Sequence, residues 1–193
     1  MTEHVLPASP FFFVRHGETD WNSAGRFQGR SDIPLNAKGL EQAAAAARQL
    51  AHEQAECIVT SPLERARQTA EAIRAATLLP LHTEPDLTEC DFSPLEGTSI
   101  STRMKLAGIT RKDELPQILP ADGESWGKVK ARALRAVHRW SARTEAPVIF
   151  VGHDAVLQAL SETLTGTWFN AEHGQPYRFT RAGRNWSATP LGG

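Results

Sequence analysis

Three short runs of consecutive apolar residues predict strands that are buried on both faces. They lie at residues 11–14 (Phe-Phe-Phe-Val), 57–60 (Cys-Ile-Val-Thr) and 148–151 (Val-Ile-Phe-Val). Runs of this kind are typical of the central strands of a parallel sheet, because helices cover both of its faces. Residues 80–83 predict a short edge strand, and the segments around residues 177–179 and 185–187 predict an antiparallel pair on a sheet edge.

Apolar residues recur at helical spacing between these runs. Asn36 can cap a helix whose inner face would consist of Leu40, Ala43, Ala44, Ala47, Leu50 and Ala51. Residues 61–64 (Ser-Pro-Leu-Glu) predict the start of a second helix, in which Ser61 is the N-cap, Pro62 lies in the first turn and Glu64 closes a capping box. This helix would run to about Ala76, with an inner face formed by Ala66, Thr69, Ala70 and Ile73.

Two more helices are expected at residues 126–143 and at about residues 155–164. The first would bury one face, formed by Val129, Ala133, Ala136, Val137 and Trp140. Its charged residues are expected on a solvated face: Lys128, Lys130, Arg132, Arg135 and Arg139. Trp126, Trp140, Trp168 and Trp186 are expected in the core or at an edge, and His173 at the surface or in packing.

The alternation of strands with helices predicts an α/β fold, a three-layer α/β/α sandwich around a mostly parallel central sheet. A length of 193 residues suits a single domain that spans residues 1–193. Gly108, Pro116 and Pro120 interrupt residues 98–120. We expect that segment to form a short helix plus a loop, a cap-like insertion that covers the site.

Composition narrows the classes of partner. The formal net charge is −1, so the protein as a whole is not basic and we expect no nucleic-acid partner. Any site that binds an anion should therefore be a local cluster of positively charged residues. Cys57 and Cys90 make no disulfide framework, which favours a reducing compartment. Residues 1–10 do not resemble a signal peptide and no apolar run approaches the roughly 18 residues of a membrane span, so we expect a cytoplasmic protein without a membrane partner.

The histidine and cysteine spacings contain no pattern typical of a metal site, so we expect neither a metal nor another cofactor. The sequence gives no indication of an oligomeric state.

Polar residues follow three of the predicted strands. Arg15 and His16 come directly after the first, Ser61 leads to Arg65 after the second, and His153 follows the third. The carboxyl ends of parallel strands meet at one edge of a sheet, so these side chains can converge. Two arginines and two histidines around one pocket favour an anion, and a phosphoryl group suits arginine because its oxygens accept bidentate hydrogen bonds.

The motifs around the first strand resemble the histidine phosphatase superfamily, the phosphoglycerate-mutase-like enzymes. Residues 15–19 read Arg-His-Gly-Glu-Thr and are followed by Trp-Asn at 21–22, Gly-Arg-Phe-Gln-Gly at 25–29 and Asp-Ile-Pro-Leu-Asn at 32–36. The resemblance implies that His16 is a nucleophile that becomes phosphohistidine. It also implies that the phosphoryl oxygens are held by Arg15, Arg65 and His153, with Asn22 as a further contact.

The same resemblance assigns Thr19, Gln28 and Gly29 to the substrate lining. Residues 87–92 (Leu-Thr-Glu-Cys-Asp-Phe) resemble the family segment that supplies the general acid, and Glu89 takes that position. Asp91 and Glu96 are the nearby carboxylates that compete with Glu89 for this assignment. Asp154 stands after His153 where many relatives have glycine; it could weaken anion binding or complement the start of the next helix.

These features predict a metal-independent phosphomonoesterase that acts on a small phosphorylated metabolite through a phosphohistidine. One alternative is a cofactor-dependent phosphoglycerate-mutase-type phosphoryl transferase. Cys90, Phe92 and Ser93 depart from the mutase pattern and residues 98–120 carry few basic residues, which favours the phosphatase. The other alternative is a catalytically weak relative that only binds phosphorylated ligands, for which the acid Glu89 would be superfluous.

Overall fold

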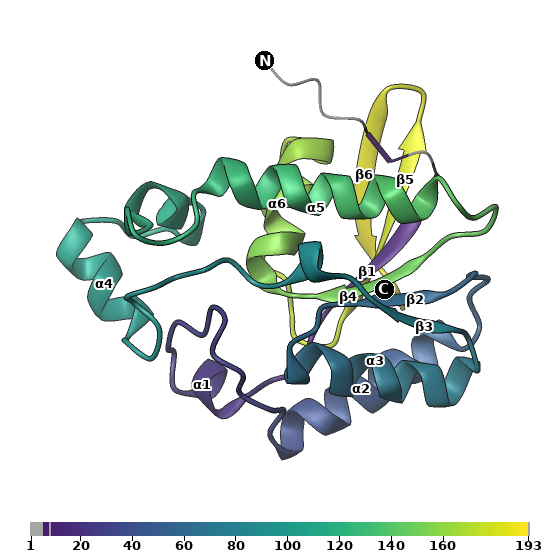
Figure 1. Cartoon of the computed structure of the whole chain (residues 1–193), viewed down its shortest axis with the longest axis horizontal. Helices are drawn as coiled ribbons and strands as arrows, with labels where there is room; N and C mark the ends of the chain where they lie inside the picture. Colours follow the sequence, from purple (N-terminus) through teal and green to yellow (C-terminus); the bar gives the residue numbers. More distant parts are fainter. Residues whose placement is uncertain (1–5, 8, 193) are drawn as a thin grey trace.

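The computed structural model describes residues 6–7 and 9–192 of the chain. Its centre is a six-stranded sheet in the order β3-β2-β4-β1-β5-β6 (Figure 1). The strands are β1 (Phe11–Arg15), β2 (Ile58–Thr60), β3 (Leu81–Thr83), β4 (Ile149–Gly152), β5 (Pro176–Ala182) and β6 (Asn185–Pro190). The first four in sheet order are parallel, while β5 runs antiparallel to both β1 and β6. The predicted strands, the edge position of β3 and the antiparallel C-terminal pair are confirmed.

Helices cover both faces of this sheet (Figure 1). One face packs against α2 (Ala37–Leu50) and α3 (Glu64–Thr77), and the other against α5 (Trp126–Ser141) and α6 (Asp154–Thr165). The side chains of β1 alternate between the two cores: Phe11 and Phe13 face α5 and α6, whereas Phe12 and Val14 face α2 and α3. The predicted three-layer α/β/α sandwich is therefore confirmed.

Residues 98–120 lie apart from the sheet. They form the short helix α4 (Ile100–Ala107) and the 3₁₀ helix η2 (Lys112–Ile118), neither of which contains a buried residue. Figure 1 places α4 at the far left of the molecule, beyond the short helix α1 (Asp20–Ser23). A further 3₁₀ turn, η1 (Pro85–Leu87), precedes Glu89. The expected helix and loop are present, although α1 and η1 were not predicted.

The predicted inner face of α2 is wrong in part, and the predicted cap of α3 is wrong. The buried face of α2 is formed by Gly39, Ala43, Ala46, Ala47 and Leu50, while Leu40, Ala44 and Ala51 are exposed. The alanine run contains no polar residue that would fix the phase of the helix. The N-cap of α3 is Leu63 rather than Ser61, and the Glu64 N–H donates to the Asp32 carboxylate at 2.7 Å. The Ser61 hydroxyl instead lies within hydrogen-bond distance of His153 Nε2, at 2.7 Å.

No helix in the described part of the chain is long and apolar enough to cross a membrane. Cys57 and Cys90 are both buried and unbridged. The expectation that residues 1–10 are not a signal peptide falls largely on residues 1–5 and 8, which lie outside the described residues.

Candidate active site

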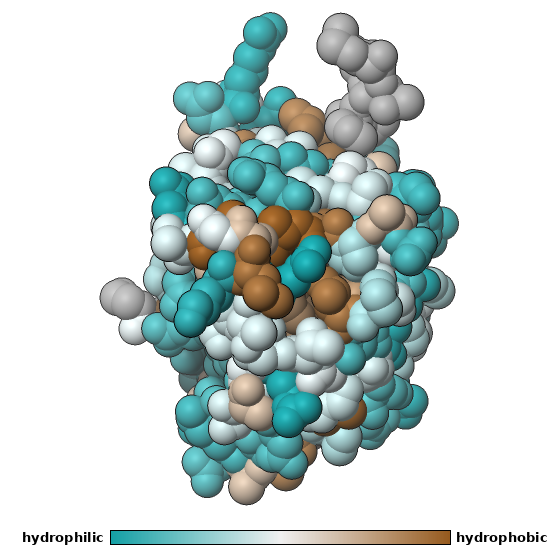
Figure 2. Space-filling model, turned by 90° about the vertical axis from the view of Figure 1, so that its left-hand side faces the viewer, coloured by the Kyte–Doolittle hydropathy of each residue, from teal (hydrophilic) through white to brown (hydrophobic). Residues whose placement is uncertain are grey.

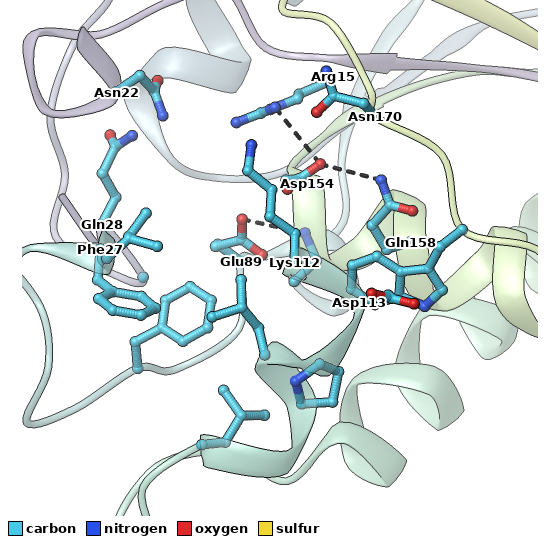
Figure 3. Close-up of a pocket in the computed structure, with 18 of the residues that line it drawn as sticks. Arg15, Asn22, Phe27, Gln28, Glu89, Lys112, Asp113, Asp154, Gln158 and Asn170 are labelled. Atoms are coloured by element: carbon cyan, nitrogen blue, oxygen red, sulfur yellow. Dashed lines mark hydrogen bonds and ion pairs between the residues drawn. The ribbon is translucent and has the colours of Figure 1, made fainter. Parts of the chain in front are cut away.

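A cavity of about 400 Å³ opens at the carboxyl edge of the parallel strands (Figure 3). Its inner part, which we call the polar floor, is lined by Arg15, His16, Asn22, Gln28, Gly29, Arg65 and Glu89. These residues come from the end of β1, from α1 and the loops on either side of it, from the first turn of α3 and from the segment after η1. Seven of the nine predicted site residues therefore share one cavity wall, although they are far apart in sequence.

His16 is held as a neutral imidazole. Its Nδ1 lies 2.6 Å from the Gly17 carbonyl oxygen, an acceptor, so Nδ1 carries the proton and Nε2 is unprotonated. The Arg65 Nε–H donates to Nε2 at 3.2 Å, which agrees with this tautomer. Burial, followed by the charges of Arg65 and Arg15, lowers the pKa of His16 well below its ordinary value. The side chain can therefore act as a nucleophile through Nε2 at neutral pH.

Arg65 is fully buried, and its guanidinium is fixed by the main chain. Nη1 donates to the Ser31 carbonyl at 2.8 Å and Nη2 to the Gly29 carbonyl at 2.7 Å. Burial lowers the pKa of Arg65 while the charge of Glu89 opposes the shift, and a guanidinium stays protonated at neutral pH. The result is a buried cation whose orientation is set before any ligand arrives.

Arg15 supplies the second cation of the floor. Its Nη1 donates to the Ala171 carbonyl at 2.8 Å and lies 3.6 Å from the Asp154 carboxylate, as the dashed line in Figure 3 shows. Arg15 Nε is buried without a hydrogen-bond partner among the described residues. Asp154 begins α6, where its carboxylate complements the start of the helix, and it also pairs with Arg15.

His153 lies next to His16 but is not among the residues that line the cavity. The two ring centroids are 5.2 Å apart in an edge-on arrangement, and His153 is fully buried. The Ser61 hydroxyl accepts from the Leu63 N–H at 3.3 Å, so its own hydrogen can point to His153 Nε2 at 2.7 Å. In that arrangement Nδ1 carries a proton, and it is buried without a partner among the described residues.

Of Glu89, Asp91 and Glu96, the three carboxylates considered for the general acid, Glu89 is the one that lines the cavity. Burial raises the pKa of Glu89, against the lowering effect of the Cys90 N–H, which donates to Oε1 at 2.8 Å. Asp91 and Glu96 do not line the cavity. Glu96 accepts hydrogen bonds from the backbone N–H groups of residues 30 and 31, so it anchors the loop that carries Gly29.

Arg132 holds the backbone just before Glu89, and its predicted place on the solvated face of α5 is wrong. It is buried, and its guanidinium donates to the Glu124 carboxylate at 2.7 and 2.9 Å. It also donates to the Asp86 carbonyl at 2.7 Å and to the Thr88 carbonyl. Asp86 and Thr88 lie far from α5 in sequence and Glu124 lies just before its first residue, so the periodicity of the helix could not reveal these partners.

Thr19, Asn22 and Gln28 form a small polar network. The Thr19 hydroxyl lies 3.0 Å from Asn22 Oδ1 and 2.9 Å from Gln28 Oε1, so the amide NH₂ groups of both residues point to the cavity (Figure 3). Thr19 itself is fully buried and is absent from the cavity wall. Gly29 has φ +54°, and a Cβ there would lie 2.0 Å from Glu96 Oε1, so the position requires glycine.

His173 is a site neighbour that sequence reasoning missed. Its ring centroid lies 5.9 Å from that of His16. Burial, followed by the charge of Arg15, lowers the pKa of His173 to about 4. The residue belongs to no motif, so only the tertiary arrangement reveals it. Within the described ranges, no group of three or more His, Cys, Asp or Glu side chains could hold a metal ion.

The geometry therefore concentrates positive charge and neutral imidazoles around a space that suits an anion. A family comparison agrees with this arrangement. The model of the histidine phosphatase superfamily (branch 1) matches residues 11–182.

Similar proteins include phosphatases and probable mutases. The chain is 34% identical over 154 residues to the uncharacterized phosphatase PhoE of Bacillus subtilis (strain 168), which covers 79% of this chain and 76% of that protein. It is 36% identical over 159 residues to the probable phosphoglycerate mutase GpmB of Proteus mirabilis (strain HI4320), which covers 80% and 74%.

A solved structure of mycobacterial glucosyl-3-phosphoglycerate phosphatase with VO3 superimposes with a TM-score of 0.80 at 25% identity, over 94% of this chain and 97% of that chain. The fold, the cavity and the family match converge, and the chain belongs to the histidine phosphatase superfamily.

Proposed function

We propose that this chain is a metal-independent phosphomonoesterase that hydrolyses a small phosphorylated molecule through a phosphohistidine at His16. The observation that carries the proposal is the pairing of a neutral His16 with Glu89 in one cavity. The two groups have opposite pKa shifts, which suit a nucleophile and a general acid that must both be ready at neutral pH.

In the first step His16 Nε2 attacks phosphorus in line. An N–P bond forms, the P–O bond to the alcohol breaks, and the leaving alkoxide takes the proton of Glu89. Arg15 and Arg65 bind the phosphoryl oxygens and stabilise the charge that develops on them. His153 Nδ1 and the Asn22 amide are the further donors.

In the second step the Glu89 carboxylate removes a proton from water. The water oxygen bonds to phosphorus, the N–P bond breaks, and phosphate leaves with His16 neutral again. Thr19 orients Asn22 and Gln28 in this scheme, while Gln28 and Gly29 border the substrate.

Two features support hydrolysis over the alternatives. A mutase must keep water away from its phosphoenzyme, whereas this cavity opens to solvent, and a module that only bound phosphate would need no buried acid. The cytoplasmic location and the absence of nucleic-acid, membrane and cofactor partners remain predictions.

Phosphate release from a panel of monoesters in EDTA tests the proposal. We expect hydrolysis by the wild type, a loss of at least about 10³-fold in His16→Ala, and no change in His52→Ala, which removes an exposed histidine at the end of α2. An alkali-stable, acid-labile phosphoryl group on His16, detected by mass spectrometry, would support the intermediate. Isomerisation of phosphoglycerate without phosphate release would favour the mutase, and binding without turnover of any ester would favour the binding-only relative.

A further inference from the structure

The outer part of the cavity differs sharply from the polar floor. We call it the outer wall; its members are the apolar residues Phe27, Phe92, Ile100, Leu115, Leu119, Trp126, Trp168 and Phe169. They come from five separate parts of the chain, including residues 98–120. Figure 2 shows apolar side chains gathered near the centre of the molecular face that carries α4, within a polar surround.

Two aromatic pairs dominate the outer wall. The ring centroids of Trp126 and Trp168 are 5.5 Å apart, and those of Phe27 and Phe92 are 5.2 Å apart. Both indole N–H groups donate to Glu162, at 2.7 and 3.4 Å, and Glu162 does not line the cavity. The tryptophans therefore present carbon to the cavity, because their only donors are turned away from it.

The charged groups at the cavity mouth largely satisfy one another. Arg111 pairs with Asp113, and Asp154 pairs with Arg15 and lies 3.4 Å from the Gln158 amide (Figure 3). Arg26 donates to a backbone carbonyl at 2.8 Å. Like Arg26, Lys112 lines the cavity and makes no ion pair with any described residue, so these two cations are the signals that compete with an apolar group and favour an anionic substituent.

We infer that the outer wall binds the organic part of the substrate, which places the physiological substrate among the phosphate monoesters of apolar, aromatic-sized alcohols. The inference rests on the proposed function and names the substrate class of the same site. An apolar group on the wall leaves water when it binds, whereas the hydroxyls of a sugar acid would lose hydrogen bonds there that carbon cannot replace. The volume of about 400 Å³ leaves room for such a group beside the phosphoryl subsite.

A series of unbranched alkyl phosphates isolates this effect, because their leaving groups have nearly the same pKa. We expect kcat/KM to rise about threefold per added methylene from ethyl to hexyl phosphate, as burial of carbon predicts. Hexyl phosphate should also exceed glycerol 3-phosphate and 3-phosphoglycerate by at least tenfold.

Variants of the wall distinguish its role from that of the catalytic floor. Trp168→Ala should lower kcat/KM for hexyl phosphate about tenfold more than kcat/KM for ethyl phosphate, and an unchanged circular dichroism spectrum would report that the variant is folded. Trp168→Phe should restore much of the preference. Leu106→Ala, which trims an exposed apolar residue of α4 outside the cavity, should change neither rate.

Flat selectivity along the alkyl series would overturn the inference. So would a preference for 3-phosphoglycerate over glycerol 3-phosphate that disappears in Lys112→Met, because that result would make the cavity mouth a carboxylate site. Failure to hydrolyse any ester would instead contradict the proposed phosphatase function.

Discussion

The polar floor and the outer wall occupy one cavity, yet they are built differently. Most floor residues are buried, and side chains such as Arg65 and His16 are held by hydrogen bonds to backbone carbonyl groups of the loops at the sheet edge. Two wall residues, Ile100 and Leu115, belong to α4 and η2, which bury no residue, and every other wall residue except Phe27 is only partly buried. The floor can act on a substrate only if its donors have the correct angles and distances. The wall can bind a substrate wherever it places apolar carbon atoms next to it.

This difference implies that the floor determines the rate of the reaction and that the wall determines which ester is preferred. Directional hydrogen bonds lose their effect when a donor moves by an ångström, while apolar contacts tolerate exchange of side chains of similar volume. Changes in the floor should therefore affect every ester equally, and changes in the wall should re-order the esters.

The largest effect is expected from Arg65→Lys. A lysine keeps the charge but cannot donate to the Gly29 and Ser31 carbonyls and to the phosphoryl group from one planar fork. We expect kcat/KM to fall by about 10³-fold for all esters, with no change in their ranking. Steady-state kinetics on ethyl and hexyl phosphate would measure this.

Arg67→Lys, on the exposed side of the same helix, is the matched control and should behave as the wild type. A changed ranking in Arg65→Lys would contradict the separation of floor from wall.

A smaller effect that depends on the leaving group is expected from Glu89→Gln. Glutamine can still accept the Cys90 N–H but cannot protonate the alkoxide. We expect about a 10²-fold loss on alkyl phosphates and about tenfold or less on p-nitrophenyl phosphate, whose leaving group needs no acid. In the wild type, the rate on alkyl esters should fall as the pH rises through the raised pKa of Glu89, and this limb should disappear in the variant.

Equal losses on alkyl and p-nitrophenyl phosphates would argue against Glu89 as the acid. Asp91→Asn is the control for the neighbouring carboxylate, and it should leave the leaving-group dependence intact.

The smallest effect concerns stability rather than rate. The pKa of His173 is about 4 in the folded protein and about 6.5 in an unfolded chain. The unfolded state therefore binds this proton first as the pH falls, and the free energy of unfolding should decrease between pH 6.5 and 4. His173→Asn should reduce the decrease by about 1 to 2 kcal/mol. Urea unfolding at several pH values would measure it, with His52→Asn as an exposed control; parallel pH curves for wild type and His173→Asn would contradict the expectation.

The central strands and most of the floor could be predicted from the sequence because their signals are local. Strands buried on both faces are unbroken apolar runs, and the motif at residues 15–19 follows one of them directly. The carboxyl ends of parallel strands meet at one edge, which was enough to bring Arg15, His16 and Arg65 together.

The remaining features depend on partners that lie outside the local helix or strand. Ser61 has the composition of an N-cap, but the side chain of His153 competes for its hydroxyl. Arg132 follows the periodicity of a solvated face, yet its acceptors come from residues 86–88 and 124. Trp126 and Trp168 were expected in the core or at an edge, and only the fold shows that their rings border the cavity.

The C-terminal hairpin has a consequence for the integrity of the molecule. Strand β5 pairs with β1 along residues 11–14, so the backbone that ends in Arg15 and His16 is an interior strand of the sheet. Without β5, β1 would be an exposed edge with free N–H and C=O groups and a run of phenylalanines, which is a template for pairing with another chain. Fragments that end before residue 176 should therefore self-associate. The hairpin of β5 and β6 lies outside the cavity, and its contribution is to prevent aggregation through β1.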